Sequence, residues 1–170
     1  LHNQLIAGQI SGKTVMVTGA AGSIGSEIVQ QVLEFKPSQL IVVDQAETPL
    51  YQLGLLVETQ LKKSHYFSLV ADIRDAFIME QIISTYQPDV IYHAAAYKHV
   101  PLMELNPYQA VLTNVMGTKI IADLAQRYKV SAFVMVSTDK AVNPSNVMGA
   151  SKRIAEMYVQ SLFKTAQLES

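Results

Sequence analysis

The sequence predicts an α/β domain with a doubly wound parallel sheet, and three observations support this prediction. Short apolar runs rich in β-branched residues alternate with amphipathic stretches along the chain. The runs are nearly continuous in apolar residues, as in strands that are buried on both faces. A glycine-rich turn joins the first run to the first amphipathic stretch. Alternating strands and helices build βαβ units, which place helices on both faces of a parallel sheet.

The predicted strands are five short segments: Thr14 to Thr18, Leu40 to Val43, Tyr66 to Val70, Val90 to His93 and Ala132 to Ser137. The predicted helices lie between and after them: Ser23 to Phe35, Thr48 to Lys63, Ala76 to Tyr86, Pro107 to Tyr128 and Val147 to Lys164. No internal repeat or linker is visible, so we expect residues 1–170 to form one domain. Such a sheet commonly continues with a sixth strand and substrate-binding elements. We therefore expect a fragment of a longer protein, truncated before its C-terminal substrate domain.

Composition narrows the class of partner. The chain carries a formal net charge of −1 and no cysteine, so we expect neither a nucleic-acid surface nor a disulfide framework. Its four histidines have no close acidic neighbours in a metal-ligand pattern, and we expect no metal. No stretch approaches the roughly 18 uninterrupted apolar residues of a membrane-spanning helix. These features predict a cytoplasmic domain that makes no membrane contact of its own.

A glycine turn follows the first predicted strand, in the order Thr18-Gly19-Ala20-Ala21-Gly22-Ser23-Ile24-Gly25. Glycines at such points let the backbone turn tightly, approach a pyrophosphate and pack a helix against a strand. The helix that follows would offer N–H groups and its positive dipole end to the anion. A structural loop without a ligand is the alternative. The pattern predicts a Rossmann-like dinucleotide site whose first members are Gly19, Gly22, Ser23, Ile24 and Gly25.

Asp44 directly follows the second predicted strand and lies 19 residues beyond Gly25. A carboxylate at about this separation holds the adenosine ribose of a dinucleotide. A free 2′-hydroxyl can donate to Asp44, whereas a 2′-phosphate would meet a like charge with no arginine beside it. The sequence therefore favours NAD as the cofactor and leaves NADP as the alternative. A solvated aspartate at a strand end is the structural alternative.

Three further segments carry a family resemblance: Ala71-Asp72-Ile73-Arg74-Asp75, His93-Ala94-Ala95-Ala96-Tyr97-Lys98-His99-Val100-Pro101 and Ser137-Thr138-Asp139-Lys140-Ala141-Val142-Asn143-Pro144. Together they resemble the extended short-chain dehydrogenase/reductases over nearly the whole chain. The last segment, followed by Asn146 to Arg153, is similar to the bacterial polysaccharide-biosynthesis UDP-N-acetylhexosamine 4,6-dehydratases. Those enzymes act on UDP-N-acetylglucosamine or a related UDP-sugar.

The resemblance implies further contacts to the cofactor. Asp72 and Ile73 would flank the adenine, Lys98 would face the active site, and Asn114 would lie near its floor. Without the family, Asp72 is a turn residue and Asn114 a hydrogen-bonded polar group of a helix. Three alanines would line the cofactor beside its nicotinamide ribose: Ala94, Ala95 and Ala96. Without the family, they indicate only tight packing.

The resemblance also implies a reaction. Hydride leaves C4 of the sugar, water is eliminated across C5 and C6, and hydride returns to C6, so the cofactor is regenerated in every turnover. Elimination needs a base at C5 and an acid at the departing hydroxyl. The family match implies Asp139 as the acid, Lys140 as the base and Thr138 as the hydroxyl that binds the sugar oxygen. A surface ion pair is the alternative for Asp139 and Lys140.

Lys152 matches the lysine that grips the ribose and assists proton transfer in this family. Most members carry a tyrosine four residues earlier, where this chain has Met148, which cannot accept a proton. A methionine-bearing branch of the dehydratases shares this feature. The group that deprotonates the C4 hydroxyl is left open among Lys140, a water held by Thr138 and Lys152, and a residue beyond position 170. A non-catalytic relative, whose helix only packs, is the alternative.

The predicted function is an NAD(P)-dependent nucleotide-sugar 4,6-dehydratase, a hydro-lyase of bacterial surface polysaccharide biosynthesis. The resemblance implies a full-length protein that is a homo-oligomer and is tethered at the cytoplasmic face of the inner membrane by a region outside this chain. Two alternatives remain. One is a nucleotide-sugar epimerase, which needs no elimination pair, and the other is an NAD-binding domain without turnover.

Overall fold

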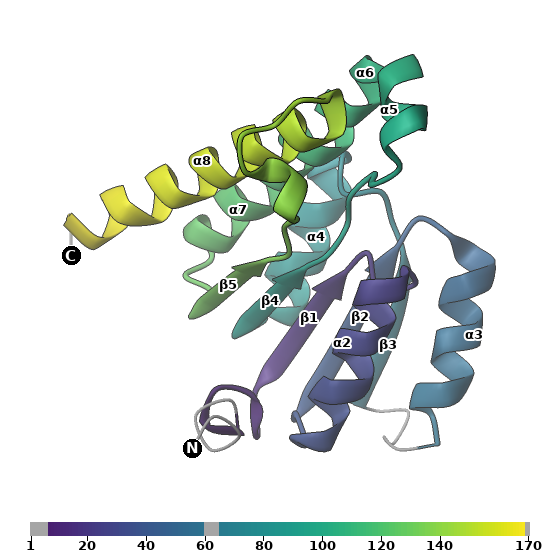
Figure 1. Ribbon diagram of the computed structural model, residues 1–170. Coiled ribbons are helices and arrows are strands. Elements are labelled where there is room, and N and C mark those ends of the chain that lie inside the picture. The colour runs from purple at the N-terminus through teal and green to yellow at the C-terminus, as the bar shows by residue number, and fades with distance from the viewer. Residues whose placement is uncertain (1–6, 60–64, 169–170) are drawn as a thin grey trace.

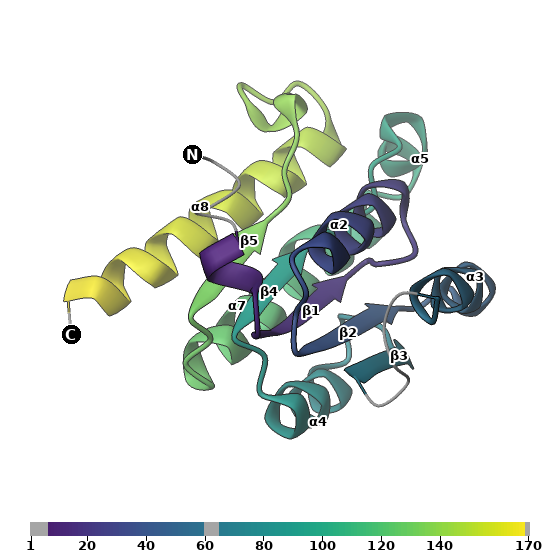
Figure 2. The same cartoon turned by 90° about the horizontal axis from the view of Figure 1, so that it is seen from below.

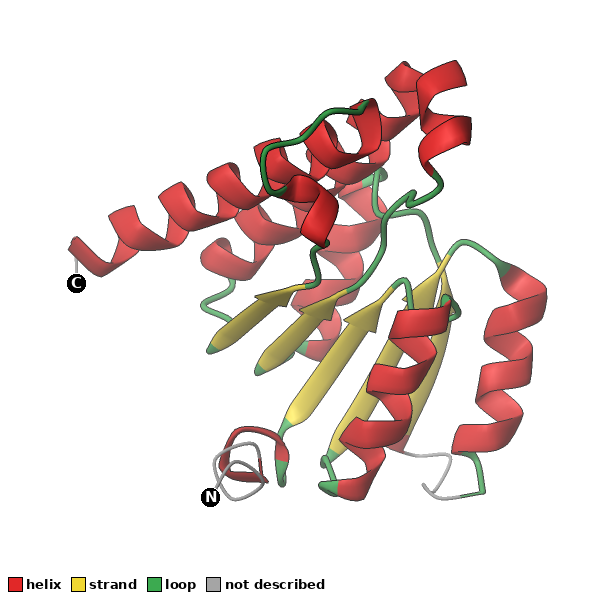
Figure 3. Ribbon diagram, viewed as in Figure 1, coloured by secondary structure: helices red, strands yellow, loops and turns green. Residues whose placement is uncertain are grey.

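The computed structural model describes residues 7–59 and 65–168, and at its centre lies one five-stranded sheet. All neighbouring strands pair in parallel, in the order β3-β2-β1-β4-β5, and their arrows point to one edge in Figures 1 and 3. The predicted doubly wound α/β fold is confirmed. The strands are β1 (Thr14–Thr18), β2 (Gln39–Asp44), β3 (Tyr66–Val70), β4 (Val90–His93) and β5 (Ala132–Met135).

Helical segments connect the strands and cover both faces of the sheet. Figure 2 shows α2 and α3 on one face and α4 and α7 on the other. This arrangement is the one that alternating strands and helices predict. The segments are α2 (Ser23–Glu34), α3 (Glu47–Val57), α4 (Ala76–Tyr86), α5 (Val100–Leu105), α6 (Pro107–Ala110), the π-helix η2 (Val111–Gly117), α7 (Thr118–Arg127), the 3-10 helix η3 (Asp139–Ala141) and α8 (Val147–Leu168).

The prediction of one regular helix from Pro107 to Tyr128 is wrong. The chain passes from α6 through η2 into α7. A π-helical turn inside a helix is a frequent mark of a functional site, and this one lies at the cavities described below. The sequence prediction also missed α5, because a segment of 6 residues is too short for a helical period to show.

Two predicted boundaries need correction. The predicted strand Ala132 to Ser137 is too long, since β5 ends at Met135 and the chain then leaves the sheet. The predicted helix Thr48 to Lys63 ends early, at Val57. Its last part, residues 60–63, lies outside the described residues.

Strand side chains alternate between two apolar clusters, one on each face of the sheet. Val15, Val17 and Leu40 pack with α2 and α3, whereas Met16 and Ile41 pack with α4 and α7. This period of two along each strand is what a sheet buried on both faces requires. The chain adds β2 and β3 on one side of β1 and then β4 and β5 on the other side. The strand order therefore reverses at the boundary between β1 and β4. Ligands of such folds bind at the carboxyl edge of this reversal.

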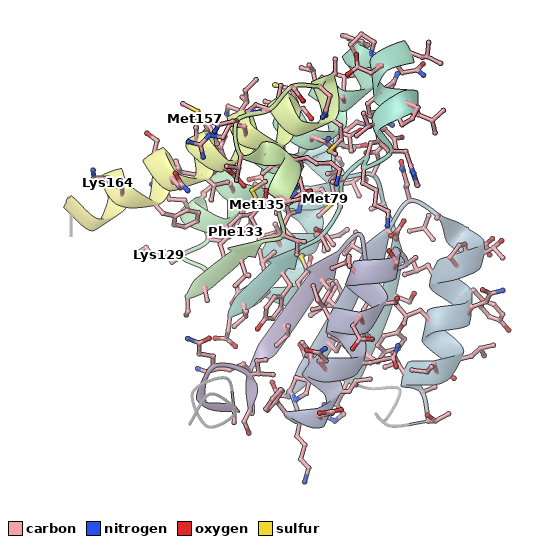
Figure 4. The ribbon with its side chains drawn as sticks, in the orientation of Figure 1. Met79, Lys129, Phe133, Met135, Met157 and Lys164 are labelled. Atoms are coloured by element: carbon pink, nitrogen blue, oxygen red, sulfur yellow. The ribbon has the colours of Figure 1, made fainter. Side chains whose placement is uncertain are left out.

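α8 extends the second layer over β5. The ring of Phe133, on β5, stacks on that of Phe163, on α8, with centroids 5.6 Å apart. Figure 4 shows Phe133 and Met135 on β5, next to α8, and Met157 and Lys164 along α8 itself. This contact holds α8 against the sheet edge, so its first turns come to lie above the carboxyl ends of β4 and β5 (Figure 1).

His93 ties the two central strands together below that edge. Its Nδ1 is hydrogen-bonded to the Thr18 hydroxyl at 2.7 Å and its Nε2 to the Thr118 hydroxyl at 2.9 Å. The imidazole is fully buried, and burial, with a smaller contribution from the charge of Lys152, lowers its pKa to about 3. His93 is therefore a neutral bridge between β1, β4 and α7.

We expect the free energy of unfolding to fall as the pH drops below about 6.5, where an unfolded histidine gains its proton. The folded state keeps His93 neutral down to about pH 3. The unfolded state then binds the extra proton, so stability is present above pH 6.5 and is lost below it, at up to about 1.4 kcal/mol per pH unit. Urea unfolding at pH 7 and pH 5 of the wild type and His93→Gln measures this component.

The exposed histidine at position 65 supplies the matched control, because His65→Gln should keep the wild-type dependence on pH. Should His93→Gln not fold, the imidazole of the wild type can be followed directly by NMR. A charged His93 in the folded protein at pH 5 would contradict the prediction.

Candidate functional site: two adjoining cavities at the carboxyl edge

The first cavity has a volume of about 230 Å³ and lies over the ends of β1, β2 and β4. Its walls come from the turn after β1, the end of β2, the turn after β3 and the segment after β4. Most of the predicted cofactor residues meet here. They are Gly19, Gly22, Asp44, Asp72, Ile73, Ala94, Ala95 and Ala96, joined by Thr113 from η2.

Glycine is required at two points of the turn. Gly19 has a φ of +66°, and a Cβ there would lie 2.4 Å from the Ala95 nitrogen. A Cβ on Gly25 would lie 2.0 Å from the Gly19 carbonyl oxygen. Gly25 is buried and lines neither cavity; it lets α2 pack against the turn. The backbone of the turn therefore forms part of the floor of the first cavity. A diphosphate could approach it closely there.

Asp44 is held by the backbone rather than by a cation. Its Oδ2 accepts a hydrogen bond from the Ala21 N–H and its Oδ1 one from the Ala46 N–H, each at 2.9 Å. The carboxylate therefore joins the glycine turn to the end of β2. Each oxygen has a second lone pair, which remains available to a hydroxyl donor in the cavity.

Asp72 has a partner of its own. The Nε of Arg74 donates to Oδ2 of Asp72 at 2.8 Å, and Arg74 also donates to the side chain of Gln109 at 3.0 Å. The hydrogen bond from the Arg74 guanidinium holds the pKa of Asp72 below its ordinary value. Ile73 is buried, and its side chain fills the space that a Cβ on Gly117 would occupy. These contacts fix the wall opposite Asp44.

Thr113 is a polar lining residue that sequence reasoning missed, as it did Tyr97, which lines both cavities. Thr113 is 5% exposed and lines the first cavity, and its hydroxyl has no hydrogen-bond partner within the described residues. Buried hydroxyls without a partner are uncommon and call for an explanation. Its neighbour Asn114 was predicted instead, because the resemblance pointed to that residue. The side chain of Asn114 is fully buried and lines neither cavity.

The second cavity, of about 300 Å³, adjoins the first through Ala94, Ala96 and Tyr97, which line both. It lies between the segment after β4, the loop after β5 and the first turns of α8. Three lysines are among its lining residues. Its lining is Ile24, Ala94, Ala96, Tyr97, Lys98, Val136, Ser137, Thr138, Lys140, Met148 and Lys152.

Thr138, Asp139 and Lys140 are adjacent, but the structure separates their surroundings. Thr138 and Lys140 line the second cavity, whereas the side chain of Asp139 is 86% exposed and lies outside the lining. The Thr138 hydroxyl donates to Oδ1 of Asp139 at 3.0 Å, and the Lys140 ammonium lies 3.3 Å from the same oxygen. The hydrogen bond from Thr138, with the charge of Lys140, holds the pKa of Asp139 below its ordinary value.

Met148 and Lys152 lie one turn apart on α8 and both face the second cavity. Met148 is 3% exposed and also packs in a small cluster with Met103 and Ala110. Lys152 is 5% exposed, and its ammonium donates to the Val136 carbonyl at 2.7 Å. Burial lowers the pKa of Lys152 to about 8. A lysine whose pKa lies near neutral pH, and which lines a cavity, can both bind and transfer a proton.

Lys98 reaches back to the glycine turn. Its ammonium donates to the Ser23 hydroxyl at 2.7 Å, at the first residue of α2. Ser23 lines neither cavity, while Ile24 next to it lines the second. A cation therefore stands at the opening of α2, where the N–H groups of the helix also face any anion.

The parallel sheet and the cavities at its carboxyl edge define a Rossmann-like α/β domain. The chain belongs to the polysaccharide biosynthesis protein family, whose model matches residues 15–170. In the described part of the chain, every helix is too short or too polar to cross a membrane.

Two curated relatives illustrate the family. The capsular polysaccharide biosynthesis protein CapD of Staphylococcus aureus is 48% identical over 163 residues, which are 95% of this chain and 27% of CapD. A UDP-N-acetylglucosamine 4,6-dehydratase (inverting) of Campylobacter jejuni is 32% identical over 143 residues, 84% of this chain and 41% of that enzyme. UDP-glucose 4-epimerases are also among the relatives. The chain thus spans less than half the length of the curated proteins it matches.

The solved structures agree with the fold. The X-ray structure of Pen from Bacillus thuringiensis superposes with a TM-score of 0.82 and 34% identity, covering 91% of this chain and 48% of Pen. The superposition covers most of this chain, with its parallel sheet and the flanking helices. The prediction of fold class from the alternating pattern is therefore supported by an independent structure.

Gly25→Ala should destabilise the domain far more than Gly22→Ala. Both added methyl groups approach the same Gly19 carbonyl oxygen, at 2.0 Å from position 25 and 3.3 Å from position 22. The first requires the backbone to move, which costs about 3 kcal/mol or more, whereas the second costs about 1 kcal/mol or less at an N-cap. Thermal unfolding of the two variants measures the difference, and equal midpoints would contradict it.

Proposed function

We propose that this domain binds NAD and belongs to a nucleotide-sugar 4,6-dehydratase that acts on UDP-N-acetylglucosamine or a related UDP-N-acetylhexosamine in bacterial surface polysaccharide biosynthesis. The observation that carries the proposal is the continuity of the two cavities. A nucleotide in the first cavity would extend past Ala94 and Ala96 to Thr138, Lys140 and Lys152 in the second. The relatives that make capsular polysaccharide or dehydrate UDP-N-acetylglucosamine support this choice.

The residues of the first cavity fit NAD. Gly19 lines this cavity without a Cβ, so its backbone is open to a diphosphate, and the Thr113 hydroxyl has no hydrogen-bond partner among the described residues. Asp44 offers lone pairs for the ribose hydroxyls. Among the described residues, neither lysine nor arginine lines this cavity, so a 2′-phosphate would meet the Asp44 carboxylate without a counter-charge. This favours NAD over NADP.

The second cavity supplies groups suited to the sugar. NAD, when bound, would take up hydride from the sugar and return it. Thr138 would hold the sugar oxygen, and Lys140, which lines the cavity, would remove the C5 proton. Asp139 would donate a proton to the departing hydroxyl. Because its pKa is low while it is exposed, the role requires that bound substrate cover the carboxylate and raise its proton affinity.

Met148 contributes packing, since its thioether has no proton to exchange. The C4 hydroxyl proton would go to Lys140, to a water between Thr138 and Lys152, or to a residue beyond position 170; Thr138, Lys140 and Lys152 all line the second cavity. Lys152, with a pKa near 8, could pass that proton on without a large energetic penalty.

Thr113→Val should have opposite effects on stability and on cofactor binding. Valine keeps the shape and removes an unpaired hydroxyl, so the free energy of unfolding of the free protein should rise by about 1 kcal/mol. NAD should bind about tenfold more weakly, because the group of NAD that is hydrogen-bonded to this hydroxyl in the complex loses its partner. Thr118→Val is the control, since its hydroxyl is paired with His93 and its loss should destabilise the free protein. Unchanged NAD affinity in Thr113→Val would contradict the prediction.

Lys140→Ala should abolish water loss while leaving NAD bound. We expect dehydration of UDP-N-acetylglucosamine by the full-length protein to fall by about 100-fold or more, as for loss of a general base. Mass spectrometry of the sugar product measures it, and calorimetry measures NAD affinity. Lys164→Ala removes an exposed lysine of α8 (Figure 4) and serves as the control. Retained dehydration in Lys140→Ala would remove this residue from the mechanism.

The same mass measurement separates the alternatives. A product lighter by one water indicates dehydration, whereas a product of unchanged mass with altered stereochemistry indicates an epimerase. NAD binding without any product from the full-length protein would favour a domain without turnover.

A further inference from the structure

The side chain of Asn114 makes two hydrogen bonds to the backbone of one residue, Tyr97. Its Oδ1 accepts from the Tyr97 N–H at 2.8 Å, and its Nδ2 donates to the Tyr97 carbonyl at 2.9 Å. Tyr97 lies beyond the end of the β4 ladders, where buried backbone groups still need partners. The amide therefore takes the place of a neighbouring strand for the segment that lines both cavities.

A third hydrogen bond carries this contact to α8. Nδ2 of Asn114 also donates to the Ser151 hydroxyl at 2.9 Å, and that hydroxyl donates to the Met148 carbonyl at 2.7 Å. Asn114 is 0% and Ser151 3% exposed. All polar atoms of the two side chains have partners, and such satisfied buried networks fix one arrangement of the elements they join.

Ser151 lies on α8, which forms one wall of the second cavity, but its own side chain lines neither cavity. Lys152 follows it directly and Met148 precedes it by one turn, and both line the second cavity from α8. Tyr97, at the other end of the network, lines the same cavity from the segment after β4. A change at Ser151 therefore alters the separation of these walls.

We propose that Ser151 is a positioning residue: through Asn114 it holds the Tyr97 segment and α8 at a fixed separation and so sets where Lys152 lies beside the bound cofactor and sugar. Ser151 itself touches neither ligand. The assignment deepens the proposed function, and only its kinetic readout rests on that function.

Loss of the Ser151 hydroxyl leaves one N–H of Asn114 buried without an acceptor. Such a group rotates or recruits water, and the second cavity becomes wetter around the Lys152 ammonium. The charged groups near this ammonium are Glu156 on α8, and Lys98 and Lys140, which line the same cavity; the imidazole of His93 is neutral. None of these is changed by substitution at Ser151, so an altered titration of Lys152 reports the altered cavity.

The test labels lysines of the full-length protein with acetic anhydride across a pH series, without cofactor, and resolves each site by peptide mass spectrometry. Burial places the pKa of Lys152 at about 8 in the wild type. In Ser151→Ala its half-labelling pH should shift upward, toward the about 10.4 of a solvated lysine. In the dehydration assay kcat should fall by about tenfold to a hundredfold from misplacement, with NAD affinity changed less than about threefold.

Three variants isolate the hydroxyl. Ser84→Ala removes a similar bond, from the Ser84 hydroxyl to the Gln81 carbonyl at 3.1 Å on α4, and should change neither readout. Ser151→Thr and Ser151→Val have the same shape, and only the first retains a hydroxyl. The half-labelling pH should lie closer to wild type in the threonine variant, which also decides the matter if Ser151→Ala does not fold.

Wild-type labelling of Lys152 and unchanged kcat in Ser151→Ala would overturn the positioning role, even if stability falls. Equal half-labelling pH in the threonine and valine variants would overturn it as well. If the wild-type protein does not dehydrate any UDP-N-acetylhexosamine, the proposed function fails, while the labelling series still decides the role of Ser151.

Discussion

The structure depends on the close contact of two backbone segments at the centre of the carboxyl edge. Gly19, after β1, approaches the Ala95 nitrogen so closely that a Cβ would lie 2.4 Å from it. Only hydrogen fits in this space, so the glycine turn and the alanine segment form one continuous floor below both cavities. His93 fixes the ends of β1 and β4 just beneath this floor and remains neutral because it is buried.

The two cavities differ in the groups they present. The first is lined mainly by small apolar residues, with the Asp44 carboxylate and the Thr113 hydroxyl, which has no partner among the described residues, as polar groups suited to the hydroxyls of a nucleotide. Around the second, Lys98, Lys140 and Lys152 gather while the Asp139 carboxylate stays outside. Like charges gathered in one cavity favour a bound anion, and burial lowers the pKa of Lys152 to about 8.

The π-helix η2 connects these two environments. Thr113 faces the first cavity, Gly117 receives the Ile73 side chain, and Asn114 reaches Tyr97 and Ser151. Sequence periodicity predicts a regular helix through this region, because one widened turn hardly changes the apolar pattern. The turn nevertheless decides which of two adjacent polar residues faces the first cavity. That is why the resemblance selected Asn114 while the structure places Thr113 on the wall.

By itself the sequence determined the strands, their parallel sense, the glycine turn and the aspartate at the end of β2. These features follow from patterns within a few residues and from the hydrogen bonds that a buried backbone needs. Tertiary structure alone decided that Asp139 lies outside the cavity that Lys140 lines, and that the Asn114 side chain is hydrogen-bonded to Tyr97 and Ser151. The reason is physical. The direction of a side chain depends on contacts between segments far apart in the chain, and local patterns carry no information about those contacts.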